Sequence, residues 1–180
     1  MPDESGRRAP EAAVGARRRR TDGVTVRRAA TRDLPDLVAL RLALLKEESR
    51  NPFFANPHPD AARRAHRLTS EELTAPGQVF LVALRDGETV GMLRCRTVRR
   101  TPLVADARQA VVTTVYVVPS QRKTGVLRAL LDGADRWCRQ HRIGAMRLQC
   151  ALGNEVGRKA WESLGFTPAE LLYLRGVPAV

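Results

Sequence analysis

The sequence has few aromatic residues, little lysine and no long apolar run. Aromatics make up 4% of its 180 residues, and they do not alternate with basic residues as on single-strand nucleic-acid platforms. No apolar run approaches the roughly 20 residues that cross a bilayer, and residues 1–20 lack the apolar segment of a secretory signal. We therefore expect a cytoplasmic protein without membrane contact, and we do not favour nucleic acid as a partner.

Cysteine is scarce as well, and its pattern predicts neither a disulfide framework nor a metal site. The three cysteines are Cys95, Cys138 and Cys150, an odd number without the paired spacing of zinc ligands. We interpret them as reduced, small core residues, because thiols persist in reducing compartments. We expect no metal cofactor.

Positive charge, in contrast, is abundant. The sequence has 31 Lys and Arg against 19 Asp and Glu, which gives a net charge of +12. That balance fits an anionic cofactor and would also fit nucleic acid. Residues 1–23 are rich in Arg, Ala, Pro and Gly, and we expect a disordered basic tail there. Residues 24–180 are long enough to form one domain with a core.

The most informative segment combines a strand, a basic loop and a helix. Val111–Val118 is mostly β-branched and hardly alternates, which favours a strand covered on both faces. Pro119 ends it, a short basic loop follows, and apolar residues then recur at helical spacing as far as Cys138. Since the first N–H groups of a helix have no internal partner, this order predicts a site for phosphate or pyrophosphate. A solvated basic turn without a ligand would show the same pattern.

The loop differs from two well-known phosphate-binding loops. It lacks the Gly-x-x-x-x-Gly-Lys-Ser/Thr of nucleotide hydrolases and the three spaced glycines of dinucleotide sites. Its one glycine, Gly125, would let the backbone approach a ligand or adopt a conformation that other residues resist. Arg122 and Lys123 add positive charge beside it.

The stretch VVPSQRKTGVL, from Val117 to Leu127, resembles the acyl-CoA loop of the GCN5-related N-acetyltransferase (GNAT) superfamily. The family pattern is Val-x-Pro, then Arg-x-x-Gly-x-Gly/Ala, then a helix. Arg122 and Gly125 match it, whereas Leu127 stands where a second Gly or Ala is usual.

A second segment is similar to the family's Asn-x6-Tyr-x3-Gly-Phe pattern. Asn154, Gly165 and Phe166 match it, and Trp161 occupies the position of the tyrosine. The resemblance covers residues 24–175, and it implies the α/β (α+β) GNAT fold. In that fold a mixed, mostly antiparallel sheet splays between its fourth and fifth strands and carries helices on both faces.

Elements expected from the local patterns follow that order. Strands are expected at 24–27, 79–85, 89–98, 111–118, 145–150 and 171–175, and helices at 60–73, 126–141 and 154–164, with a further helix ending near residues 47–50. The family usually ends with two strands beyond the last helix, and only one fits here. The other is very short, missing, or supplied by the second subunit of a homodimer.

The resemblance also implies acetyl-CoA as co-substrate, with an amine attacking the thioester directly. A backbone N–H near Val117 would polarise the thioester carbonyl, backbone N–H groups from Gln121 to Arg128 would hold the pyrophosphate, and Asn154 would hold the CoA arm. Asn154 is also suited to be the N-cap of the last helix. The residues expected to bind the cofactor are Val117, Val118, Gln121, Arg122, Lys123, Thr124, Gly125, Val126, Leu127, Arg128, Asn154 and Trp161.

Proton transfer is harder to assign. Many family members place a Glu on the fourth strand, but no carboxylate lies between Ala107 and Leu131 here. A base must come from Glu47, Glu48, Glu71 or a water chain, and our candidate is Glu47. Trp161 cannot give a proton to a thiolate, so Tyr173 is the candidate acid. Catalysis mainly by proximity is an alternative.

The acceptor site is expected in the turn-rich segment Asn51–Asp60 and the helix after it. Phe53, Phe54 and His58 are our candidates for contact with the acceptor; alternatively, the Phe pair packs on the sheet. We predict an acetyl-CoA-dependent N-acetyltransferase acting on a primary amine of a small molecule. The alternatives are a non-catalytic acyl-CoA-binding module and an acetyltransferase of protein or peptide amines.

Overall fold

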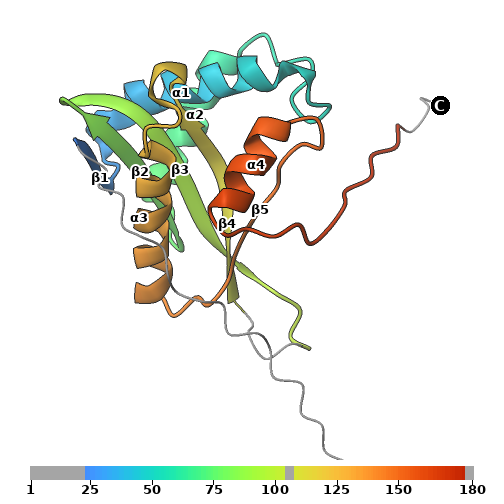
Figure 1. Cartoon of the computed structure of the whole chain (residues 1–180). Coiled ribbons are helices and arrows are strands. Elements are labelled where there is room, and N and C mark those ends of the chain that lie inside the picture. The colour runs from blue at the N-terminus through green and yellow to red at the C-terminus, as the bar shows by residue number, and fades with distance from the viewer. Residues whose placement is uncertain (1–22, 104–107, 177–180) are drawn as a thin grey trace, which may run out of the picture.

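A computed structural model describes residues 23–103 and 108–176 of the chain. It contains a five-stranded sheet in the order β1-β2-β3-β4-β5, in which β1 to β4 pair antiparallel and β5 pairs parallel with β4. The predicted mixed, mostly antiparallel sheet is thereby confirmed (Figure 1). The strands are β1 (Val24–Arg28), β2 (Gln78–Arg85), β3 (Glu88–Arg99), β4 (Arg108–Val117) and β5 (Met146–Leu148), and the helices are α1 (Leu34–Glu47), α2 (Ala61–Thr74), α3 (Val126–Gln140) and α4 (Glu155–Ser163).

Helices cover both faces of the sheet, as expected (Figure 1). Helix α3 lies on one face, where Leu130, Ala134 and Trp137 join the larger core cluster. It packs so closely that a Cβ on Gly133 would lie 2.9 Å from the Cδ1 of Leu81. Helices α1 and α2 cover the other face, over a second buried cluster: Ala29, Leu37, Leu40, Phe80, Val82, Met92 and Tyr116.

The hairpin between β2 and β3 turns through Asp86 and Gly87. Both have positive φ, 51° and 84° respectively, which is the backbone conformation of the two-residue turns that match the twist of paired strands. The turn predicted from the Asp-Gly dipeptide is therefore present. It lies at the end of the sheet where β4 finishes, because Val90 just beyond it bonds to Val118.

Strands β4 and β5 diverge after a short shared segment. Their pairing extends only from Ala110 opposite Met146 to Val112 opposite Leu148. The register of β4 against β3 also shifts at this point, which leaves Thr113 as an extra residue in β4. From there to Val117, β4 has a partner on one side only among the described residues. The expected splay is thus confirmed.

Two expected strands differ from the structure. The fifth strand covers residues 146–148 rather than 145–150, and residues 171–175 form no strand. β-propensity measures how well a side chain fits a paired, half-buried surface, and the three-residue β5 gives this segment no long edge to pair with. The apolar side chains concerned are 60% to 87% exposed: Leu171, Leu172, Tyr173 and Leu174.

The expected basic tail lies outside the described residues, apart from Gly23. Within residues 23–103 and 108–176, no helix combines the length and the apolar character that a bilayer crossing requires.

Candidate active site

The end of β4 presents backbone groups on the side that β5 leaves open. Val118 donates its N–H to the carbonyl of Val90 at 3.0 Å, and Val117 lies opposite Gly91. Hydrogen bonding alternates along an antiparallel pair. The N–H and the carbonyl of Val117 therefore point away from β3, toward the open side of β4.

The loop after β4 leads directly into the N-terminus of α3. Pro119–Gln121 forms a 3₁₀ turn, in which the N–H groups of Gln121 and Arg122 donate to the carbonyls of Val118 and Pro119. The first N–H of α3 with a helical acceptor is that of Ala129. Within the described residues, no acceptor is present for the backbone N–H groups from 123 to 128. Of the N–H groups predicted to hold pyrophosphate, those of Gln121 and Arg122 are therefore already bonded, and the groups from 123 to 128 remain.

Left-handed backbone shapes this loop. Gly125, the N-cap of α3, has φ of 92°, and Lys123 has φ of 63°, which is uncommon for a residue with a Cβ. The free N–H groups and the helix dipole act together at this point, so the loop has the electrostatics of an anion site.

The guanidinium of Arg122 is engaged on three sides. Its Nε donates to the carbonyl of Val117 at 3.0 Å, its Nη2 lies 2.6 Å from a carboxylate oxygen of Glu47, and its Cζ lies 5.5 Å from the ring centre of Tyr116. The hydrogen bond to Glu47 raises the pKa of Arg122 above its usual range. Burial, assisted by the nearby Glu47 carboxylate, raises the pKa of Tyr116.

Asn154 begins α4 and also contacts the end of α1. Its Oδ1 accepts from the N–H of Gly157 at 2.8 Å, which confirms the predicted N-cap. Its Nδ2 lies 3.4 Å from Glu48, whose other carboxylate oxygen accepts from Asn51. Glu48 therefore connects the end of α1 to the start of α4. Trp161, two turns further along α4, packs partly buried against the larger core cluster, and its contact with the cofactor stays a prediction.

The predicted acceptor residues lie on the loop between α1 and α2. Phe53 and Phe54 are 57% and 43% exposed, so the alternative in which both rings pack on the sheet is wrong. His58 accepts the N–H of Asp60 at 3.0 Å, and its other ring nitrogen lies 3.0 Å from Arg64. It therefore braces the loop against α2, and its role toward an acceptor stays a prediction.

Comparison with known proteins identifies the family. Residues 42–166 match the model of the acetyltransferase (GNAT) family.

The chain belongs to the GNAT family. It is an acetyl-CoA-dependent N-acetyltransferase, with acetyl-CoA as its co-substrate.

Relatives of this GNAT protein include two curated enzymes and many solved structures. It is 29% identical over 155 residues to an aminoglycoside N(6')-acetyltransferase type 1 of Stenotrophomonas maltophilia, an alignment that covers 84% of this chain and 92% of that one. It is 25% identical over 126 residues to the enzyme of the same description from Acinetobacter haemolyticus, covering 68% and 83%. A predicted acetyltransferase of Clostridium acetobutylicum, solved with acetyl-CoA, has a TM-score of 0.70 and 21% identity over 84% of this chain and 96% of that one.

Sequence reasoning missed a polar network on the α1 and α2 face of this GNAT sheet. Glu72 of α2 accepts a hydrogen bond from Arg41 and forms an ion pair with Arg94 of β3 at 2.9 Å. Arg94 also donates to Gln78 and to the Oγ1 of Thr113. The signal was present, because Arg94 interrupts an apolar run on β3, but its partners are distant in sequence. The guanidinium of Arg94 therefore lies beside Thr113 of β4, the strand on which many family members carry a Glu.

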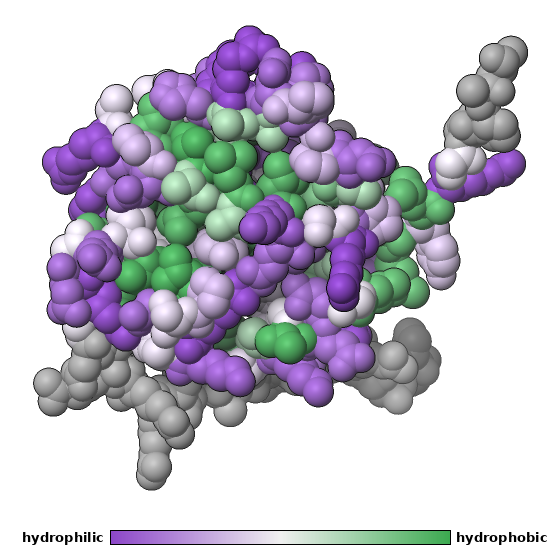
Figure 2. All heavy atoms as spheres, turned by 90° about the horizontal axis from the view of Figure 1, so that it is seen from above, coloured by the Kyte–Doolittle hydropathy of each residue, from purple (hydrophilic) through white to green (hydrophobic). Residues whose placement is uncertain are grey.

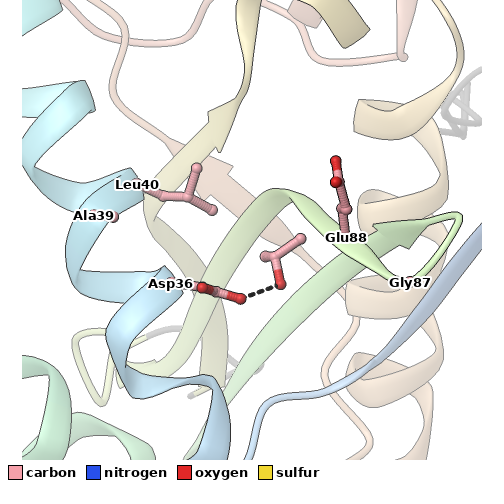
Figure 3. Close-up of a pocket in the computed structure, with 6 residues that line it drawn as sticks. Asp36, Ala39, Leu40, Gly87 and Glu88 are labelled. Atoms are coloured by element: carbon pink, nitrogen blue, oxygen red, sulfur yellow. Dashed lines mark hydrogen bonds between the residues drawn. The ribbon is translucent and has the colours of Figure 1, made fainter.

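A hollow of about 320 Å³ lies elsewhere, between the first turns of α1 and the β2–β3 hairpin (Figure 3). The Oγ1 of Thr89 donates to Asp36 across its edge at 2.6 Å. None of the residues predicted to bind the cofactor lines it. Among the described residues, no cluster of His, Cys, Asp and Glu could hold a metal ion.

Proposed function

We propose that this enzyme acetylates a primary amine of a small molecule by direct attack on acetyl-CoA within a ternary complex. The observation that carries the proposal is the open side of β4 at Val117. The anion-binding turn at the start of α3 follows it in the chain, and the end of α1 lies beside it through the contact between Arg122 and Glu47. Both substrates can therefore reach one backbone position.

The chemistry follows from that position. The pyrophosphate of CoA accepts from the free N–H groups between Lys123 and Arg128, and the thioester carbonyl accepts from the N–H of Val117. A preorganised donor of this kind contributes about 3 kcal/mol to transition-state stabilisation. The amine nitrogen attacks the carbonyl carbon, the C–N bond forms and the C–S bond breaks. The amine gives up a proton and the CoA thiolate takes one, so no other reactant is needed.

A small acceptor is favoured by the contact of Glu48 with Asn154. It joins the end of α1 to the start of α4, whereas a peptide acceptor would need a continuous groove between these two helix ends. Two relatives are aminoglycoside N(6')-acetyltransferases, whose substrates are small molecules with several amines.

An amine panel tests this proposal. The enzyme with acetyl-CoA is expected to release CoA thiol with at least one member of a set of aminoglycosides, polyamines and arylalkylamines, and mass spectrometry should identify the acetylated amine. Peptides with a free N-terminus or a lysine form the comparison arm. Faster turnover of the peptides would favour a protein acceptor, and no turnover of any amine despite CoA binding would overturn the proposal.

We also propose that a second copy of the chain covers the C-terminal apolar segment. The side chains of Leu171, Leu172 and Leu174 are 60% to 64% exposed, and the segment extends away from the sheet without a pairing strand (Figure 1). Hydrophobic side chains are visible on this projecting segment in Figure 2. Consecutive apolar residues left in water mark an interaction surface rather than scattered exposure.

Light scattering after size exclusion measures the expected dimer. The measured mass of the parent protein should be twice the chain mass of 19.9 kDa. A Leu172→Asp, Leu174→Asp variant should have the mass of a monomer, because the dimer interface would bury two charges without partners. Leu103→Asp, which changes another exposed leucine (91%), should leave the dimer intact. A monomeric parent chain would contradict the proposal.

A further inference from the structure

Arg122 lies in the predicted cofactor loop, yet its side chain turns back toward β4 and α1. The Nε bond to the carbonyl of Val117 spans five residues, and the Nη2 bond to Glu47 spans 75. The guanidinium also lies over the ring of Tyr116, whose side chain is buried in the cluster beneath α1 and α2. One side chain thus joins the end of β4, the end of α1 and the core between them.

These contacts satisfy the charge of Arg122 within the protein. A short pair between a guanidinium and a carboxylate is a charge-assisted hydrogen bond, about twice as strong as a neutral one. The Nε and Nη2 groups of Arg122 are therefore directed at Val117 and Glu47 rather than held in reserve for pyrophosphate. The backbone N–H groups from Lys123 to Arg128, which have no acceptor among the residues that the structure describes, are available for that anion.

The contact with Val117 lies at the proposed reaction centre. The carbonyl of Val117 points to the open side of β4, where no strand in the described part of the chain supplies it with a donor. The Nε of Arg122 supplies that donor, and so fixes the peptide unit next to the N–H that is proposed to polarise the thioester. Small displacements of a preorganised donor reduce its effect on the transition state.

We propose that Arg122 and Glu47 are positioning residues, a pair that holds the end of β4 in the orientation that acetyl transfer requires. The inference rests on the role proposed above for the Val117 N–H. It replaces the base role predicted for Glu47, because its carboxylate is bonded to a cation that would have to be displaced before a proton could be accepted. It also replaces a direct role of the Arg122 side chain on pyrophosphate.

Three variants separate positioning from cofactor binding. Glu47→Gln removes the ion pair and leaves the Nε bond, Arg122→Lys keeps a cation for Glu47 but has no Nε donor, and the third variant combines both changes. For each, kcat and KM are measured with the best amine of the panel, and the Kd of CoA is measured by calorimetry. Glu162→Gln, an exposed acid on α4, is the matched charge control.

We expect each single variant to lower kcat at least about tenfold while the Kd of CoA changes less than about threefold. The kcat of the double variant should be about equal to that of the slower single variant, because the effects of two changes within one coupled pair do not add. A tenfold rise in the Kd of CoA with kcat unchanged would instead make Arg122 a cofactor ligand. Independent, multiplying effects on kcat, or unchanged kcat, would also overturn the inference.

An NMR measurement does not depend on finding the amine. The backbone amide resonance of Val117 should shift in Glu47→Gln and in Arg122→Lys, and should stay in place in Glu162→Gln. If it stays in place in all three, the pair does not hold the end of β4 and the inference fails. If it shifts while the parent enzyme acetylates no amine, the proposed function fails and the positioning of Val117 stands.

Discussion

Replacing Gly125 with glutamate is expected to abolish acetyl-CoA binding at micromolar concentrations. Gly125 is the N-cap of α3 and has φ of 92°, a conformation that costs a residue with a side chain about 1–3 kcal/mol. The new carboxylate would also lie at the proposed pyrophosphate site, where two like charges a few ångströms apart repel by about 1–4 kcal/mol. A loss of about 2.8 kcal/mol corresponds to a hundredfold rise in Kd, which calorimetric titration would measure.

Two control variants divide that loss between its causes. Gly125→Ala imposes the backbone strain without the charge, so its effect should be the smaller. Gly144→Glu adds the same charge at a glycine whose φ is not positive and whose Cβ would meet nothing within 4 Å, and it should bind acetyl-CoA as the parent does. If Gly125→Glu binds as tightly as Gly144→Glu, the turn at the start of α3 is not the pyrophosphate site.

The sequence was sufficient wherever the determining contacts are local. The Asp86-Gly87 turn, the helical spacing from Val126 to Cys138 and the Asn154 cap each depend on residues a few positions apart, and each is present. The splay between β4 and β5 came from the family resemblance rather than from these local patterns. The pairing between β4 and β5 ends after Val112, and the residue types in these two strands do not indicate where it ends.

Contacts between distant residues account for what the sequence did not show. Positive charge was interpreted as a general attraction for an anionic cofactor, but several arginines are committed to carboxylates from other elements. Arg122 is paired with Glu47, and Arg41 and Arg94 share Glu72. In the loop itself, the positive features that remain are the backbone N–H groups without an acceptor and the exposed Lys123. The segment 171–175 was mispredicted for a related reason, since a strand requires an edge that propensity does not reveal.

Replacing Glu72 with alanine is expected to lower the free energy of unfolding by about 3–5 kcal/mol, the usual cost of removing one partner of a buried ion pair. The side chains of Glu72, Arg41 and Arg94 are only 11% to 14% exposed. Without the carboxylate, two guanidinium groups would remain close together without this counter-charge, and the Nε of Arg41 already has no hydrogen-bond partner among residues 23–103 and 108–176. Helix α2 would also lose its polar attachment to β3. Urea unfolding followed by circular dichroism measures the change.

The preceding residue supplies the control. Glu71 is on the same helix, its side chain is 66% exposed, and its closest cation is Arg67 at 3.9 Å. Glu71→Ala should therefore change stability by less than about 0.5 kcal/mol, as surface substitutions usually do. Equal losses in the two variants would contradict the prediction, because the buried carboxylate of Glu72 would then contribute no more than the exposed one of Glu71. A loss confined to Glu72→Ala would show that the carboxylate is required where two arginines meet beneath α2.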